Sequence, residues 1–207
     1  MIAMVDEFIL YDDVQYTKND WRNRNLIKTF QGPKWLTIPV YHNLKQRIKE
    51  TRISDFNWNK KHWNALVANY SKATCFKETR PVFEQLYLNR HETFLSEINT
   101  TFIREINRFL EIKTRVTSSL DYALAGDPTE RLVGLCKQVG VTEYLSGPSA
   151  KNYLNLSTFE EEKIDVHWMN YDAYKIYPQL FPPFLHQVTV LDLIFNVGKN
   201  FRPYLYQ

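Results

Sequence analysis

Residues 114–170 alternate strand-like and helix-like patterns, and this alternation limits the fold more than any other feature of the sequence. The runs at 114–118, 141–146 and 165–170 have the length and composition of short strands. Between the first two, Asp127-Pro128-Thr129-Glu130 predicts a helix start, and Gly140 predicts its end. Because a helix between two strands favours parallel pairing, we predict an α/β fold with a mixed or mostly parallel sheet flanked by helices.

The N-terminal half predicts a β-hairpin near residues 24–40. Its second apolar run, at 35–40, follows the turn signal Gln31-Gly32-Pro33. Asn57 then predicts the cap of a helix, and an apolar stripe over residues 95–110 predicts a longer amphipathic helix. We assign this longer helix to the core scaffold and give it no chemical role.

Length and composition fit one compact domain over residues 1–207. The formal charge of +3 is far from the strongly basic surface of a duplex-binding module, so no duplex nucleic acid is expected as a partner. Cys75 and Cys136 form no CxxC pair, which favours a reducing compartment. Since the sequence has no secretory signal and no long apolar run, we expect a cytoplasmic protein without a membrane span.

A dense group of charged and amide side chains begins where an apolar run ends. Asp12 and Asp13 follow that run, and Gln15 and Lys18 come soon after. Ligands of open α/β sheets bind beyond the carboxyl ends of strands, so we predict a catalytic role for the two acids. Gln15 and Lys18 are predicted to bind substrate. The alternative is a solvated turn or a helix cap.

The basic and amide residues of WRNRN are candidates for substrate binding. Arginine can neutralise phosphate oxygens through its planar fork. In a strand, Arg22 and Arg24 would share one face while Asn23 and Asn25 share the other, so only one set could line a site. We favour Asn23 and Asn25, together with Arg24 near the strand end.

His62 is the histidine with the most suggestive surroundings, since it lies between Lys61 and Trp63 on the helix after Asn57. We predict that it acts as a general base, because its intrinsic pKa suits proton transfer near neutral pH. A surface histidine on a basic helix end is the alternative. The five histidines show no i, i+4 pair and no HExxH motif, so no metal site is predicted.

Two further polar residues are candidates for substrate binding. Ser146 ends a predicted strand before Gly147, where backbone N–H groups can meet an anion. A plain strand-to-loop turn explains Ser146 equally well. Gln179 is a candidate polar contact near the C-terminus. Asp192, three residues after Thr189, follows the pattern of a capping box and is expected to have a structural role.

Six segments, in order and at their separations, carry a resemblance that extends over nearly the whole chain: DEFILYDDVQYTK, WRNRNLIK, WLTIPV, NKKHWNALVANY, EYLSG and VTVLDLIFNVGK. Together they resemble the WbqC-like protein family. Members of that family open with a strand and a segment like HQPxYxPWxGYF, which has no counterpart here. No role of that segment is therefore carried over to this sequence.

The resemblance implies an acyl or aminoacyl (glycine) transferase that acts on a nucleotide-linked or lipid-linked amino sugar in bacterial surface polysaccharide (O-antigen) biosynthesis. A free amino acid must be activated before transfer, commonly with ATP, so ATP is the cofactor that this role suggests. In this hypothesis Asp12 or Asp13 deprotonates the amine, Lys18 and Arg24 hold phosphate, and the amides orient the sugar.

Two other classes of function stay open from the residues. The first is a non-catalytic sugar or nucleotide-sugar binding protein, in which Trp21 and Trp35 stack on the ligand. The second, ranked a distant third, is single-stranded RNA binding, since basic and aromatic side chains alternate through residues 16–35. Turnover on a supplied amino sugar separates the transferase from the binding protein, and a steep salt dependence would mark RNA binding.

Overall fold

The structure, a computed structural model, describes residues 1–171 and 174–205 and divides into two compact units. Unit 1 comprises Met1–Asp13 and Ile112–Ala173, and unit 2 comprises Val14–Glu111 and Tyr174–Gln207. Each unit is therefore built from two separate stretches of the chain. In the part of the chain that the structure describes, no helix is both long and apolar enough to cross a membrane.

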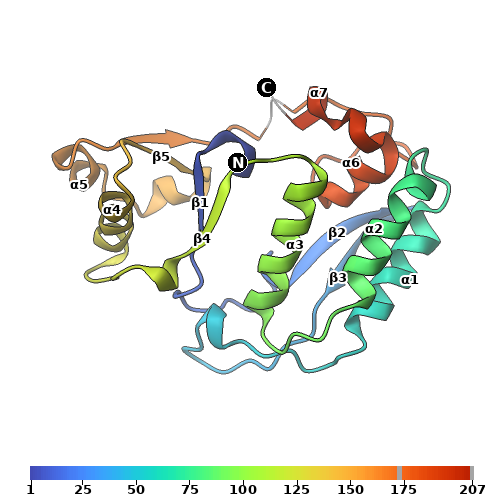
Figure 1. The fold of residues 1–207 in the computed structure, drawn as a ribbon, viewed down its shortest axis with the longest axis horizontal. Coiled ribbons are helices and arrows are strands. Elements are labelled where there is room, and N and C mark those ends of the chain that lie inside the picture. Colours follow the sequence, from blue (N-terminus) through green and yellow to red (C-terminus); the bar gives the residue numbers. More distant parts are fainter. Residues whose placement is uncertain (172–173, 206–207) are drawn as a thin grey trace. The chain divides into compact units, whose positions relative to one another are not determined.

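Unit 1 contains two parallel strand pairs, although β4 and β5, the strands on either side of α4, do not pair with each other among the described residues. β1 pairs with β4, with Phe8 opposite Val116, and β5 pairs with β6, with Leu145 opposite His167. Its elements, coloured in Figure 1 by their place in the sequence, are η1 (Ile2–Met4), β1 (Glu7–Leu10), β4 (Arg115–Ser118), η3 (Ser119–Asp121), α4 (Pro128–Val139), β5 (Glu143–Ser146), η4 (Pro148–Asn152), α5 (Leu156–Glu161) and β6 (Asp165–Trp168).

Helix α4 begins and ends at the predicted residues. Asp127 Oδ1 accepts hydrogen bonds from the N–H groups of Thr129 and Glu130 at 2.8 and 2.9 Å, and Glu130 Oε2 accepts one from the Asp127 N–H at 2.8 Å. Gly140 ends the helix in the left-handed conformation, with φ of 74°. A core cluster of unit 1 consists of the buried side chains of Val133 and Cys136 from α4, Phe159 from α5, and Ile164.

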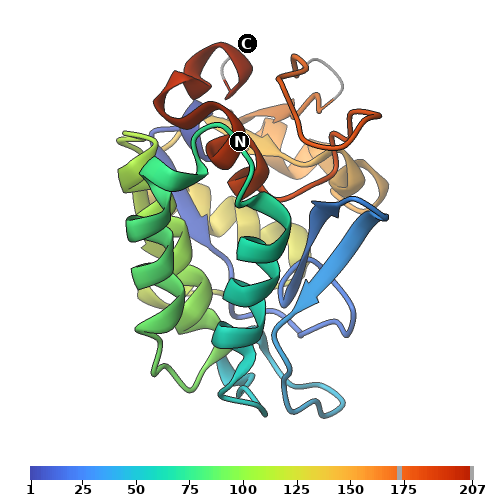
Figure 2. The same ribbon diagram turned by 90° about the vertical axis from the view of Figure 1, so that its right-hand side faces the viewer.

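Unit 2 combines the hairpin with a set of helices. β2 and β3 are antiparallel, and Thr29 pairs with Gly32 across the turn. The hairpin lies beside α1, and α1 lies beside α2 (Figures 1 and 2). The elements of unit 2 are β2 (Arg24–Thr29), β3 (Gly32–Thr37), η2 (Ile48–Glu50), α1 (Trp58–Tyr70), α2 (Phe76–Leu88), α3 (Leu95–Phe109), α6 (Val190–Val197), η5 (Gly198–Phe201) and α7 (Arg202–Leu205).

Aromatic side chains hold the helices of unit 2 together. Trp63 of α1 stacks on Phe76 of α2, with ring centroids 6.2 Å apart. Phe195 of α6 meets Phe76 at 5.0 Å and Phe83 at 5.6 Å, both edge to face. The high aromatic content of the sequence is therefore used in large part for packing, although other rings of unit 2 line a pocket described below.

A buried hydrogen-bond network joins β2 to α6 and to the segment before α6. The Lys28 ammonium donates to Gln179 Oε1 and to the Pro183 carbonyl, each at 2.5 Å. Gln179 Nε2 and the Tyr177 hydroxyl each donate to Asp192 Oδ1 at 2.8 Å. Burial lowers the pKa of Lys28, and the Asp192 carboxylate opposes that shift. Asp192 thus has a structural role, because its carboxylate accepts hydrogen bonds from side chains that lie outside α6.

The prediction of an α/β fold with a hairpin is confirmed. The strands form three two-stranded pairs among the described residues, two parallel and one antiparallel. Helix α2 was not predicted, and it contains Pro81, which has no N–H to donate to the preceding turn. Burial of Phe83 and Tyr87 stabilises this helix, which is a tertiary effect. The prediction of one domain over residues 1–207 stays a prediction.

Candidate functional site

A pocket of about 200 Å³ lies within unit 2, between the start of the hairpin and the helices α1, α3 and α6. We call it the hairpin pocket. Its polar lining side chains include four of the predicted site residues, Asn23, Arg24, Asn25 and His62, together with Arg22 and Asn99. Its apolar lining includes Trp58, Leu66, Tyr87, Phe102, Ile106 and Leu191. The structure therefore brings together residues that are far apart in the sequence.

The segment before β2 explains why neighbouring residues can all line the pocket. Arg22 and Asn23 lie in a turn, and the strand begins only at Arg24. The Asn23 N–H donates to the Asp20 carbonyl at 3.3 Å, and Asn99 Nδ2 of α3 donates to the Arg22 carbonyl at 2.9 Å. Strand alternation does not apply within a turn. Arg22 and Asn23 therefore lie outside the strand on which the expectation of two alternating faces was based.

Asn23 and Arg24 each hold a buried polar atom without a hydrogen-bond partner among the described residues. Asn23 is 5% exposed, and its Nδ2 donates to the Ile38 carbonyl at 3.0 Å, while its Oδ1 accepts nothing. The Arg24 guanidinium lies 4.1 Å from the centre of the Trp35 ring, and its Nε donates to no acceptor. Buried polar groups are normally paired, and these two atoms, like four others among the described residues, are closed to solvent and unpaired.

His62 is 8% exposed and held in one tautomer by its surroundings. Its Nε2 lies 2.9 Å from the Thr37 carbonyl oxygen, which can only accept, so Nε2 carries the hydrogen and Nδ1 keeps the lone pair. The Trp58 and Tyr87 rings meet the imidazole edge to face, with centroids 5.2 and 6.4 Å away. Burial lowers the pKa of His62, and the bond to Thr37 opposes that shift. The imidazole is therefore neutral at pH 7.

The hairpin pocket has a basic and amide side and an apolar interior. None of the described residues that line it is Asp or Glu, and its permanent charges are Arg22 and Arg24. The Arg22 guanidinium also pairs with Asp20, which does not line the pocket. An ammonium group would have no carboxylate partner among these lining residues. The pocket therefore suits a neutral or anionic ligand.

The other predicted residues of unit 2 lie elsewhere in that unit. Gln15 is exposed and forms an isolated antiparallel bridge with Arg47, and Lys18 is exposed in the following turn. Gln179 belongs to the buried network, where its side chain bonds to Lys28 and Asp192. None of these three candidates lines the hairpin pocket.

Three predicted site residues belong to unit 1. The Asp13 carboxylate accepts a hydrogen bond from the Arg131 guanidinium at 2.7 Å, and the same guanidinium donates to the Tyr11 hydroxyl at 3.0 Å. Asp12 lies next to Asp13, just after β1. Ser146, at the end of β5, is buried, and its carbonyl accepts from the Met169 N–H at 2.9 Å. The roles predicted for these three residues stay predictions.

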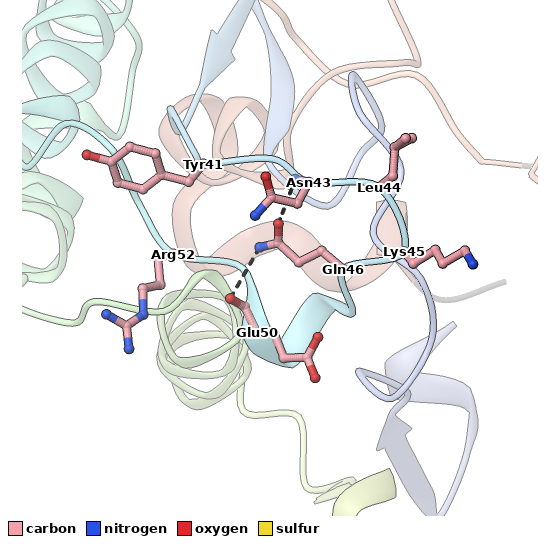
Figure 3. A pocket seen from close by; sticks show the side chains of 7 residues that line it. All are labelled: Tyr41, Asn43, Leu44, Lys45, Gln46, Glu50 and Arg52. Carbon is pink, nitrogen blue, oxygen red and sulfur yellow. Dashed lines mark hydrogen bonds between the residues drawn. The ribbon is translucent and has the colours of Figure 1, made fainter.

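A second hollow of unit 2, of about 660 Å³, is lined only by the segment from Tyr41 to Arg52. The Gln46 side chain accepts from the Asn43 N–H at 2.9 Å and donates to the Glu50 carbonyl at 3.2 Å. Figure 3 shows that the side chains of Tyr41, Lys45 and Arg52 point in different directions. Since these side chains do not converge, we place no site there.

The comparison with known proteins agrees with the resemblance noted in the sequence. The model of the WbqC-like protein family matches residues 1–203. The chain belongs to the WbqC-like protein family. A relative from Mycobacterium tuberculosis, named "Uncharacterized protein Rv1507c", is 48% identical over 207 residues, which cover 99% of this chain and 90% of that protein. No solved structure matches the chain at a significant level.

The sequence did not predict several residues that line the pocket of this family member. Helix α3 was assigned to the scaffold alone, yet its Asn99, Phe102 and Ile106 line the hairpin pocket. The sequence contains one signal for Asn99: it is a polar residue that directly follows Ile98 of the apolar stripe. Thr189 and Leu191 also contribute, and no local pattern links them to the hairpin. Among the described residues, no cluster of three or more His, Cys, Asp or Glu has a metal-binding arrangement.

Proposed function

We propose that this protein transfers an acyl or aminoacyl group to the amine of a nucleotide-linked or lipid-linked amino sugar, in bacterial surface polysaccharide (O-antigen) biosynthesis. The observation that carries the proposal is the neutral His62 in a pocket lined by Asn23, Arg24 and Asn25. Membership of the WbqC-like family is consistent with this role. The volume of about 200 Å³ is below the ~300–1,000 Å³ typical of sites for drug-sized ligands, so only the part of the substrate around its amine is expected to enter.

His62 is the proposed general base of the reaction. An ammonium group has no lone pair, so the acceptor amine must lose a proton as it forms the new N–C bond to the acyl carbonyl. His62 Nδ1 takes that proton, while Nε2–H stays bonded to the Thr37 carbonyl, which also stabilises the imidazolium. The acyl carbon releases its previous leaving group with the electron pair of the broken bond. The bond to Thr37 fixes the tautomer in advance.

The two arginines supply the electrostatic part of the proposal. A positive charge near the amine favours its neutral form, because an ammonium would be repelled. The same charge stabilises the oxygen of the acyl carbonyl as negative charge develops there. Asn23, Asn25 and Asn99 are the proposed contacts to the sugar, since amides both donate and accept hydrogen bonds. ATP as the activator of a free acid stays a prediction, and no residue of the hairpin pocket is assigned to it.

The proposed alternative is a sugar-binding protein without catalysis. It is favoured by Trp21 and Trp35, which are 56% and 39% exposed and have ring centroids 5.0 Å apart. Exposed aromatic faces of this kind suit the apolar face of a sugar ring. The two functions differ in turnover alone, so a product assay decides between them.

The test is mass spectrometry of an amino sugar nucleotide incubated with the protein and activated acyl or aminoacyl donors. The wild-type protein is expected to give an N-acylated product, and His62→Gln to reduce its rate by about 10²–10⁴-fold. His91→Gln is the matched control, since His91 is exposed in the segment before α3 and is expected to leave the rate unchanged. Equal rates for His62→Gln and wild type would refute the assignment of the base. Absence of product with every donor, despite sugar binding, would favour the alternative.

A further inference from the structure

We infer that the hairpin pocket binds the N-acylamino group of the sugar, with an uncharged alkanoyl group rather than a glycyl group in the apolar interior. This inference rests on the proposed transfer to an amino sugar and narrows the group that is transferred. Three properties of the pocket carry it: its arginine and amide lining, the lack of acidic side chains among its described lining residues, and its volume.

The polar lining combines the Arg24 guanidinium, which only donates hydrogen bonds, with the amides of Asn25 and Asn99, which donate and accept. An N-acylamino group offers both an N–H and a carbonyl oxygen, so this mixed lining can pair both of its polar groups.

The charges of the lining residues separate an alkanoyl group from a glycyl group. At pH 7 a glycyl group ends in an ammonium, whereas a propanoyl group of the same shape ends in a methyl. The interior of the pocket consists of side chains such as Leu66, Phe102 and Ile106, and none of the described lining residues is acidic. An ammonium placed there would be desolvated without a counter-ion and would lie near Arg24. A methyl group gains from the same burial.

The volume limits the length of the acyl chain. The pocket, of about 200 Å³, is smaller than the ~300–1,000 Å³ sites that take drug-sized ligands. A short acylamino group with its attachment carbon fits this space, while the rest of the sugar stays at the entrance, where Trp21 is exposed. We infer that acetyl, propanoyl and butanoyl groups fit and that long fatty acyl chains do not.

The experiment compares two ligands of nearly equal shape, N-propanoylglucosamine and N-glycylglucosamine, by titration calorimetry on the full chain. The propanoyl compound is expected to bind at least tenfold more tightly, and glucosamine and glucose to bind more weakly than either. Equal or tighter binding of the glycyl compound would overturn the inference. So would equal binding of glucose and the propanoyl compound.

Two variants locate the ligand. Arg24→Gln is expected to weaken binding of the propanoyl compound about tenfold or more, because a charged donor is lost. The matched control is Arg52→Gln, since Arg52 also lies over an aromatic ring, that of Phe94 at 5.0 Å, outside the hairpin pocket. Ile106→Phe is expected to weaken N-butanoylglucosamine more than N-acetylglucosamine, because it narrows the apolar interior. If Arg24→Gln does not fold, Ile106→Phe alone decides, and an equal effect on both chain lengths would contradict the inference.

The inference and the proposed function fail in different ways. Tight binding of the propanoyl compound with no product from any donor would support the inference and refute catalysis. Product formation from a glycyl donor, together with tighter binding of the glycyl compound, would support the transferase and overturn the inference.

Discussion

Replacement of Asp192 by Asn should severely destabilise unit 2, because this buried carboxylate accepts hydrogen bonds from several elements. Its Oδ2 accepts from the Tyr70 hydroxyl of α1 at 2.8 Å, and its Oδ1 accepts from Tyr177 and Gln179, each at 2.8 Å. Asparagine keeps one of these oxygens and puts an NH₂ in place of the other, so at least one donor loses its acceptor. The buried Lys28 ammonium also loses the nearby negative charge.

The expected loss in free energy of unfolding is about 1.5–3 kcal/mol, the range for a hydrogen bond to a charged group. For a chain of this length each kcal/mol lowers Tm by about 2–4 °C, so Tm should fall by about 3–12 °C. Urea denaturation followed by tryptophan fluorescence measures the change. The control is Asp165→Asn, exposed in β6, which should change stability by less than about 0.5 kcal/mol.

A second variant tests the reasoning about charge. If the uncompensated Lys28 ammonium causes part of the loss, Lys28→Met in the Asp192→Asn background should cost less than Lys28→Met in the wild type. Independent, additive effects of the two changes would show that Lys28 and Asp192 do not interact. A loss below about 1 kcal/mol for Asp192→Asn would refute the structural role assigned to the carboxylate.

Two further predictions concern His62 and the cap of α4. The pKa of His62 is lowered in the folded protein, so as pH falls the histidine of the unfolded chain binds a proton first. The contribution of neutral His62 to folding stability is therefore present above about pH 6.5 and is lost below it. The wild type should therefore lose more stability than His62→Gln between pH 7 and pH 5 in urea denaturation, and parallel pH profiles would contradict the lowered pKa. Asp127→Ala should destabilise the protein by about 0.5–2 kcal/mol, since two N–H groups lose their acceptor. Asp127→Asn, which keeps a capping oxygen, should recover most of that loss, and an equal loss for both variants would contradict the cap.

Local patterns in the sequence were sufficient for features that depend on neighbouring residues. The Asp127 cap, the Gly140 end of α4 and the hairpin near residues 24–40 follow from short-range rules of capping and turns, and the structure confirms them. Helix α2 was missed because Pro81 disfavours a helix locally, while the burial that stabilises it depends on distant residues.

The candidate site was predicted in part. Asn23, Arg24, Asn25 and His62 were chosen for their chemistry, and the structure places them around one pocket. Gln179 was chosen on the same grounds, yet its side chain belongs to the buried network. The polarity of a residue indicates that it needs partners. It does not tell whether those partners are protein groups or a ligand.

The sequence by itself determined the class of fold, the helix ends, the hairpin and the set of polar residues from which a site could be made. Only the tertiary structure decided that α3 and α6 complete the lining of the hairpin pocket, and that the Thr37 carbonyl fixes the tautomer of His62. The physical reason is how far apart in the sequence the interacting residues lie. Capping and turn formation depend on residues a few positions apart, whereas burial, desolvation and the pairing of polar atoms depend on residues that only folding brings together.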